Sequence, residues 1–173
     1  MPDKEKGTEK LAYFSAGQYL SVELKVGEAT ITRPYSISSS PKDALNGKYE
    51  LTIKRVDGGL ATNYVLDNWT EGAKVTLSAP EGEFGYEPLR DAKTVIGIAG
   101  GSGITPFLSF ANAIADGDED AKLVLLYGSR TADEILFKEE FDGIEKKCDK
   151  VKVVHVLSGE NKEGYEHGFM TAE

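Results

Sequence analysis

The amino-acid sequence predicts a β + α/β protein, with an antiparallel β-barrel over residues 1–88 and a parallel α/β domain over residues 89–173. Two observations indicate this order. Residues 19–79 contain several runs in which apolar and polar side chains alternate with period two, as in half-buried strands. From residue 94 onwards, short apolar runs alternate with segments of helical periodicity, which is typical of parallel strands joined by right-handed crossovers. The boundary is placed in the turn-rich stretch from Pro80 to Asp91.

The barrel is expected to consist of short strands connected by turns. The run from Tyr19 to Val26 alternates most clearly between apolar and polar side chains. Further strands are expected at Ala29–Ser38, Lys48–Val56 and Lys74–Ala79, because turn residues separate these runs. One short helix is expected to interrupt them, at about Ala61–Trp69.

The α/β domain is expected to contain three strands, at Thr94–Ala99, Leu123–Tyr127 and Val151–Val156. A glycine-rich loop follows the first strand, and apolar residues then recur at helical spacing from Phe107 to Ile114. A second helical region is expected from Ala132 to Lys147. Thr131 and Glu134 are spaced as a capping box at its start.

The composition excludes several classes of protein. A formal net charge of -9 argues against nucleic acid and against an anionic membrane surface as partners. No apolar run approaches the roughly 20 residues that span a bilayer, and residues 1–10 lack the apolar centre of a signal peptide. The single cysteine, Cys148, excludes an internal disulfide, and the two histidines, His155 and His167, have no third ligand that would indicate a metal site. We therefore expect a cytoplasmic protein without a bound metal.

The first motif that suggests chemistry is Arg33-Pro34-Tyr35-Ser36, within an expected strand. An arginine provides a planar fork for phosphate, and a tyrosine provides a face on which a flat ring can stack. The motif therefore fits a ligand with a phosphate at one end and an aromatic ring at the other. Taken alone, it fits a partly exposed barrel strand equally well.

The second motif is the run from Gly58 to Tyr64, in which Gly58-Gly59 precedes a helix and Thr62 lies in its first turn. Free backbone N–H groups and the helix dipole make such a turn an anion site. An ordinary capped helix has the same pattern, and on this motif alone that simpler interpretation is favoured.

The third motif, Gly100-Gly101-Ser102-Gly103 followed by Thr105 and Pro106, is more specific. It follows an expected strand and opens a helix, which is the context of a loop that binds a pyrophosphate. Thr105 is expected to cap the helix and Pro106 to occupy its first position. An ordinary strand-to-helix turn does not need three glycines, so this motif favours function.

In this order and spacing, the motifs resemble those of the ferredoxin–NADP reductase superfamily, which includes flavin reductases and the reductase components of oxygenases. The resemblance covers nearly the whole chain after residue 11. The matching segments are residues 16–19, Arg33–Ser36, Ile53–Arg55, Gly59–Tyr64, Gly100–Pro106, Tyr127–Arg130 and residues 135–141.

The resemblance implies a flavin-binding barrel and a Rossmann-like nucleotide-binding domain, with FAD and NADH or NADPH as cofactors. Hydride would pass from the nicotinamide dinucleotide to flavin N5, and electrons would then pass to an unidentified acceptor, a protein or an iron–sulfur carrier. Tyr35 and Ser36 would be the catalytic pair, with Tyr35 against the isoalloxazine and Ser36 near N5.

The resemblance assigns the remaining residues to binding. On the flavin, Arg33, beside Pro34, would pair with the pyrophosphate, Ile53 and Lys54 would line the ribityl chain and ring, and the pyrophosphate would also meet Gly59, Leu60, Ala61 and Thr62. On the dinucleotide, the loop of Gly100, Gly101, Ser102 and Gly103 would allow close approach. Thr105 would lie beside the nicotinamide, and Ser129 and Arg130 along the adenosine half.

Two departures from the family pattern matter. Members that use NADPH carry Ser-Arg after the third strand, whereas this chain has Ser158-Gly159-Glu160, which favours NADH. The family also has five parallel strands, and only three are recognisable here. A Cys-Gly-Pro motif and a terminal segment are missing, and Met1–Lys10 does not read as a barrel strand. We therefore expect a fragment or an incomplete gene model, with Thr94–Ala99 as an unpaired sheet edge and with slow hydride transfer.

Two alternatives remain open. One is a non-catalytic flavin-binding electron-transfer subunit that passes electrons within a larger complex. The other is a truncated product that binds flavin poorly and has no activity. The intact loop from Gly100 to Pro106 favours the reductase over the electron-transfer subunit, whereas a colourless purified protein would support the truncated product.

Overall fold

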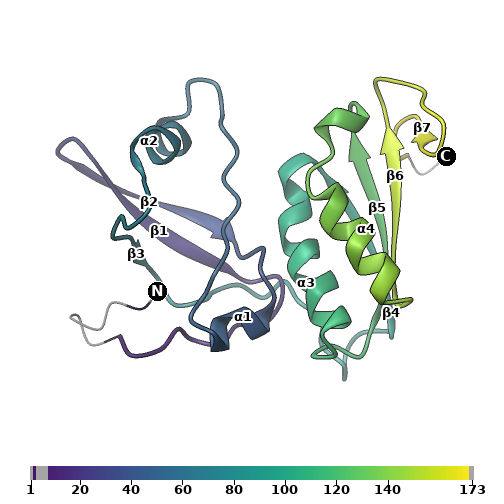
Figure 1. Ribbon diagram of the computed structural model, residues 1–173, viewed down its shortest axis with the longest axis horizontal. Coiled ribbons are helices and arrows are strands. Elements are labelled where there is room, and N and C mark those ends of the chain that lie inside the picture. Colours follow the sequence, from purple (N-terminus) through teal and green to yellow (C-terminus); the bar gives the residue numbers. More distant parts are fainter. Residues whose placement is uncertain (1, 3–7, 172–173) are drawn as a thin grey trace.

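The computed structural model describes residues 2 and 8–171, which form two lobes (Figure 1). The N-terminal lobe is built on an antiparallel sheet with strand order β2-β1-β3. The C-terminal lobe is built on a parallel sheet with order β4-β5-β6-β7. This confirms the predicted β + α/β class. Most of the segment Met1–Lys10, which was not expected to form a strand, lies outside the described residues.

The N-terminal sheet is centred on a hairpin of β1 (Tyr19–Val26) and β2 (Ala29–Ser36). Val22 pairs with Arg33 in its register, and Gly27 turns the chain with a positive φ of 62°. The predicted alternation is confirmed, since Leu20, Val22 and Leu24 are almost fully buried. Side chains on one face of the hairpin pack against α2 (Leu60–Asn68). This helix begins and ends one residue earlier than predicted.

The strand predicted at Lys48–Val56 is wrong, because only a single bridge, between Ile37 and Leu51, forms there. The Ser38 N–H still donates to the Glu50 carbonyl, and serine hydroxyls supply the neighbouring bonds. Ser38 Oγ donates to the carbonyl of Glu50, and Ser39 Oγ accepts from the Glu50 N–H. The strand predicted at Lys74–Ala79 shrinks to β3 (Thr76–Leu77) for a similar reason, since the neighbouring Ser78 hydroxyl accepts from the Ser21 N–H.

The C-terminal sheet contains β4 (Thr94–Gly100), β5 (Lys122–Ser129), β6 (Val151–Leu157) and β7 (Glu166–His167). The first three strands confirm the prediction. The fourth, β7, was not predicted, because two residues are too short to show a period. Among the described residues β4 forms one edge of this sheet, as expected.

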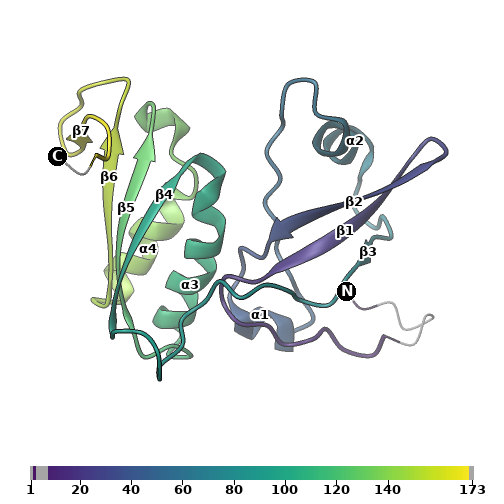
Figure 2. The ribbon, with the colours of Figure 1, turned by 180° about the vertical axis from the view of Figure 1, so that it is seen from behind.

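Two helices, α3 (Thr105–Ala115) and α4 (Lys138–Lys147), cover one face of the parallel sheet. Seen from behind, no helix of the described part of the chain lies in front of the other face (Figure 2). Ile96 and Ile98 are 69% and 63% exposed there. A short helix, α1 (Pro41–Leu45), lies in the N-terminal lobe beside α3.

The predicted helix from Ala132 to Lys147 is divided in two. A 3-10 turn, η3, spans Ala132–Glu134, and α4 begins only after Phe137, whose φ of 59° is left-handed. The predicted capping box is also wrong, because Thr131 makes no side-chain cap hydrogen bond. The Ala132 N–H is instead satisfied by the carboxylate of Glu160, at 2.6 Å. None of the helices within residues 8–171 is long and apolar enough to cross a lipid bilayer.

Candidate functional site

The hairpin strand β2 presents Arg33 and Tyr35 on one face, because residues two apart in a strand point the same way. Tyr35 packs in the apolar cluster that includes Ile53 and Ala61, so this face of β2 is turned toward α2. Burial raises the pKa of the Tyr35 phenol, and the charge of Arg33 partly offsets this rise. The structure thus brings Arg33, Tyr35, Ile53 and Ala61 into one region, although they come from three separate motifs.

The N-terminus of α2 has the geometry of an anion site. Gly58 has a φ of 67°, and Gly59 lies at the N-cap without a side-chain cap. A Cβ added at Gly59 would lie 2.7 Å from Thr62 Oγ1 and 3.0 Å from the Val56 carbonyl oxygen, so only glycine fits this turn. Thr62 Oγ1 is buried and has no hydrogen-bond partner among the described residues. A buried hydroxyl without a partner is costly, which indicates that a ligand completes it.

The glycine-rich loop after β4 has open backbone geometry at the start of α3, as expected of a loop that approaches an anion closely. Gly101 has a φ of 52°, and Gly101–Ile104 form the 3-10 turn η2 ahead of the helix. The predicted cap is therefore wrong. Ile104 is the N-cap, and Thr105 is the first helical residue. The Thr105 hydroxyl donates to the Ser102 carbonyl, at 2.6 Å, and fixes the loop to the helix. No atom lies within 4 Å of a Cβ placed at Gly101 or Gly103, so the space beside the loop is open to a ligand.

A pocket of about 310 Å³ lies at the carboxyl ends of the parallel strands, where α/β proteins bind their ligands. It joins predicted residues of both lobes: Lys54 comes from the N-terminal lobe, while Gly101, Ser129 and Arg130 come from the C-terminal lobe. Ser129 Oγ is buried there, at the end of β5. The remaining lining residues are Gly128, Glu134, Leu136, Val156, Ser158, Gly168, Phe169 and Met170.

Tyr127 has a contact that the sequence analysis missed. Its side chain is fully buried, and its hydroxyl donates to the Gly101 carbonyl, at 3.3 Å, while it accepts from the Leu136 N–H, at 3.1 Å. Burial raises the pKa of the phenol, so it stays protonated as a donor. Tyr127 belongs to a motif that was singled out, but its hydroxyl contacts depend on residues that are distant in sequence. Met170, which would collide with a side chain at Gly128, gave no sequence signal.

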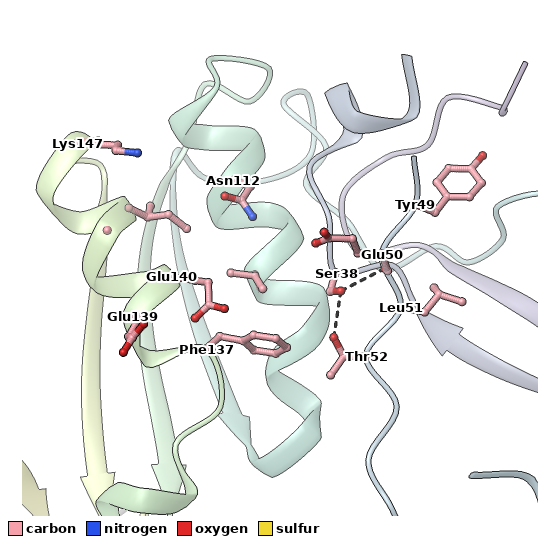
Figure 3. Close-up of a pocket in the computed structure, with 13 residues that line it drawn as sticks. Ser38, Tyr49, Glu50, Leu51, Thr52, Asn112, Phe137, Glu139, Glu140 and Lys147 are labelled. Carbon is pink, nitrogen blue, oxygen red and sulfur yellow. Dashed lines mark hydrogen bonds between the residues drawn. The ribbon is translucent and has the colours of Figure 1, made fainter. Parts of the chain in front are cut away.

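A second cavity, of about 730 Å³, lies between the lobes (Figure 3). Ser38, Glu50 and Thr52 line it on one side, and Phe137 and α4 line it on the other. Glu139 and Glu140 of α4 are exposed and also border this cavity. Within the described residues, no group of three or more His, Cys, Asp or Glu side chains is placed to hold a metal ion.

Two domain families match the chain along almost its whole length. The Oxidoreductase FAD-binding domain family matches residues 5–86, and the Oxidoreductase NAD-binding domain family matches residues 98–173. The chain belongs to the ferredoxin–NADP reductase-like superfamily. Its two lobes are therefore the FAD-binding lobe and the NAD-binding lobe, and these names are used below.

Curated relatives within the superfamily include NADH-cytochrome b5 reductase 1 of Dictyostelium discoideum, 35% identical over 84% of this chain and 50% of the relative. The glycine betaine monooxygenase reductase subunit of Pseudomonas aeruginosa is 31% identical over 85% of this chain and 39% of the relative. The chain thus spans half or less of the length of these relatives.

Solved structures show the same fold. The FAD/NAD-binding domain of a nitric oxide dioxygenase from Vibrio cholerae superposes with a TM-score of 0.82, covering 94% of this chain and 69% of that one at 24% identity. A cytochrome P450 reductase from Amycolatopsis gives a TM-score of 0.77 at 28% identity, covering 94% of this chain and 48% of that one.

Proposed function

We propose that this chain binds FAD in one lobe and NADH against the other, and that it passes hydride between them and electrons onward to an acceptor. The observation that carries this proposal is the pocket in which Lys54 of the FAD-binding lobe meets Gly101, Ser129 and Arg130 of the NAD-binding lobe. A ligand in this pocket contacts both lobes at once, as a hydride donor must.

On the FAD side, the residues fit the cofactor. The pyrophosphate would accept hydrogen bonds from the unpartnered Thr62 hydroxyl and the free N–H groups of Leu60 and Ala61, at the positive end of α2. The Arg33 guanidinium would pair with the same charge, and the face of Tyr35 would support the ring system. Pro34, Ser36, Gly59, Ile53 and Lys54 would complete the binding surface.

On the dinucleotide side, Gly100, Gly101, Ser102 and Gly103 would leave room for the pyrophosphate at the start of α3. Thr105 would lie beside the nicotinamide, while Ser129 and Arg130 would bind the adenosine half at the end of β5. When bound, the two cofactors supply the redox chemistry, with hydride donated by the nicotinamide and accepted at flavin N5. The protein holds the two rings in line, which in favourable cases is worth roughly 7–11 kcal/mol of the barrier.

NADH is the proposed donor because glycine, Gly159, follows Ser158 after β6, where members of the family that use NADPH carry an arginine for the 2′-phosphate. A side chain at Gly159 is excluded, since its Cβ would lie 2.8 Å from Arg130 Cγ. Glu160 places a negative charge there and is held by the Ala132 N–H. Lys162 lies over the ring of Tyr165, 5.9 Å from its centroid, and Arg130 is the cation that could compensate.

The proposal is tested with purified protein in three steps. The protein should be yellow and release FAD on denaturation, kcat/KM should be higher with NADH than with NADPH, and a soluble electron acceptor should be reduced. FMN alone as the released flavin would contradict the FAD assignment, and an equal or higher value with NADPH would contradict the cofactor preference. Flavin that binds but never accepts hydride would leave the non-catalytic electron-transfer subunit as the better interpretation.

A further inference from the structure

One helix, α3, touches both halves of the proposed reaction site. Its N-terminus follows the dinucleotide loop Gly100–Gly103. Its middle and its C-terminal end are hydrogen-bonded to residues 39 and 40 of the FAD-binding lobe. These residues come three and four positions after Ser36, at the end of the proposed flavin strand. A rigid element therefore runs from the dinucleotide loop to the continuation of the flavin strand.

The first of these bonds is made by Ser109. Its hydroxyl donates to the Ser39 carbonyl, at 2.8 Å, and both residues are buried, with exposures of 0% and 2%. Water cannot replace either partner in such a place, so loss of the hydroxyl would leave the carbonyl unsatisfied. A buried serine in the middle of an apolar helix face needs such a partner, and here the partner lies in the other lobe.

The second bond is made at the C-terminal end of α3. Ser40 Oγ donates to the carboxylate of Asp116, at 2.5 Å. Lys42 adds an ion pair with Asp118, at 3.3 Å, and a hydrogen bond to the Asp116 carbonyl. Acidic side chains at a helix C-terminus are unfavourable with the helix dipole. Their presence here is offset by the contacts with Ser40 and Lys42 from the FAD-binding lobe.

The segment of residues 38–40, which is hydrogen-bonded to α3, is also hydrogen-bonded to the segment that contains Ile53 and Lys54. Ser38 Oγ donates to the Glu50 carbonyl and lies 3.1 Å from the hydroxyl of Thr52, next to Ile53 and Lys54 (Figure 3). Residues 38–40 thus connect the two segments that would line the flavin, β2 and residues 52–54, with the helix that follows the proposed dinucleotide loop.

We propose that Ser109 and Asp116 are positioning residues that set the distance between the nicotinamide and flavin N5. This rests on the proposed function. Hydride transfer requires reacting atoms about 3–3.5 Å apart, so a small rotation of one lobe relative to the other is enough to slow it. The two bonds fix that rotation at two points, seven residues apart on α3.

We expect the lobes to remain attached when these bonds are lost. Aromatic rings of the segment between them pack on α3 as well, with Phe84 against Phe107 and Tyr86 against Phe110, at centroid distances of 5.6 and 6.0 Å. Removal of the two polar contacts should therefore leave the protein folded while its lobes sample a wider range of orientations.

The chain carries one tryptophan and one cysteine, which report the arrangement of the lobes without added residues. Trp69 follows α2 in the FAD-binding lobe, and Cys148 follows α4 in the NAD-binding lobe. Time-resolved energy transfer from Trp69 to a dye on the Cys148 thiol should give a narrow distance distribution in the cofactor-free wild type. The distribution should broaden in the Ser109→Ala/Asp116→Ala double variant and in each single variant.

Two further variants separate positioning from stability. Asp116→Asn keeps an oxygen that accepts from Ser40 and should restore the narrow distribution. Asp120→Ala removes a carboxylate bonded to Lys93 and Lys150, all within the NAD-binding lobe, and should leave it narrow. With FAD bound, the double variant should reduce its flavin with a limiting rate on the order of 10- to 100-fold lower, at unchanged half-saturating NADH and unchanged FAD affinity.

A folded double variant with wild-type energy transfer and wild-type limiting rate would overturn the positioning role. If the double variant does not fold, the single variants decide the question by the same two readouts. The energy-transfer measurement needs no cofactor. A wild-type protein with a narrow distribution that is not reduced by NADH would therefore contradict the proposed function alone.

Discussion

Both lobes begin a helix with a glycine-rich turn, but they support that turn differently. In the NAD-binding lobe seven of the eleven residues of α3 are buried. The hydroxyls of Thr105 and Tyr127 donate hydrogen bonds to the loop carbonyls of Ser102 and Gly101. In the FAD-binding lobe only Ala61 and Val65 of the nine residues of α2 are buried, and the Thr62 hydroxyl has no hydrogen-bond partner within the described part of the chain. The proposed dinucleotide loop is thus held by the protein core, whereas on our proposal a bound flavin would supply the missing partner in the other turn. The predictions below test this difference.

The largest expected effect is a difference in stability between two equivalent truncations. Leu108→Ala in α3, where the leucine is 5% exposed, should lower the free energy of unfolding by about 2–5 kcal/mol. Leu66→Ala in α2, where the leucine is 43% exposed, should change it by about 0.5 kcal/mol or less. Urea denaturation of both cofactor-free variants measures the two values. Equal losses would show that α2 is as firmly supported as α3.

Arg33→Ala should weaken FAD binding by about 1.5–3 kcal/mol, because a charge-assisted bond to the pyrophosphate is lost. The fold of the cofactor-free protein should not change, since this guanidinium donates only to the adjacent Thr32 carbonyl among the described residues. Fluorescence titration with FAD measures the affinity, and Lys25→Ala, which removes an exposed charge from the partner strand, is the control. Full FAD occupancy in Arg33→Ala would show that the flavin pyrophosphate binds elsewhere.

Thr62→Val should have opposite effects on stability and on binding. The substitution removes a buried hydroxyl that lacks a partner, so the cofactor-free protein should be as stable as wild type or more stable, by about 1 kcal/mol. FAD affinity should fall, because the same hydroxyl is proposed to bind the pyrophosphate. Thermal unfolding with and without FAD measures both effects. A loss of stability together with unchanged FAD affinity would assign Thr62 to the fold alone.

The smallest expected effect is a pH dependence of the free energy of unfolding. It arises from His155 in the NAD-binding lobe, which contains both histidines of the chain. Burial lowers the pKa of His155, and Lys138 lowers it further, against the weaker opposing charges of Asp142 and Glu145. The unfolded chain therefore binds a proton near pH 6.5 that the folded chain does not bind, so stability should fall as the pH drops below this value.

His155→Gln should flatten this dependence between pH 7.5 and 5.5, as measured by urea denaturation. His167→Gln is the control, since His167 is exposed and its ring bonds the Glu160 carbonyl. Equal slopes in wild type and His155→Gln would show that the His155 imidazole is protonated as easily in the folded protein as in the unfolded chain.

Local patterns were enough to predict the hairpin, the first three parallel strands and both glycine-rich turns. Period-two alternation from Tyr19 to Val26 and the strand–glycine–helix order around Gly100 are properties of adjacent residues. The same patterns could not predict the loss of the strand at 48–56, because that outcome depends on hydroxyls of Ser38 and Ser39. The bond from Ser109 to Ser39, 70 residues apart, leaves no periodic trace in the sequence.

In the candidate site, too, local features could be predicted from the sequence, whereas tertiary contacts could not. Each glycine loop was predicted from its own neighbours, but their supports were not, because Tyr127 and Met170 reach the site only through tertiary packing. Lys54 was expected to contact the flavin, and the structure places it in the pocket shared with Gly101 and Arg130. Which of these residues contact a cofactor remains a prediction of the proposed function.

The measurement that tests the central claim most directly is anaerobic stopped-flow mixing of the FAD-loaded chain with NADH, followed by flavin absorbance. The account predicts that the flavin is bleached in a single turnover, that the rate saturates with NADH, and that deuterium at the transferred position of the nicotinamide slows it. Free FAD at the same concentration is the control. A protein that holds both FAD and NADH, as shown by equilibrium binding, but keeps its flavin oxidised would contradict the account.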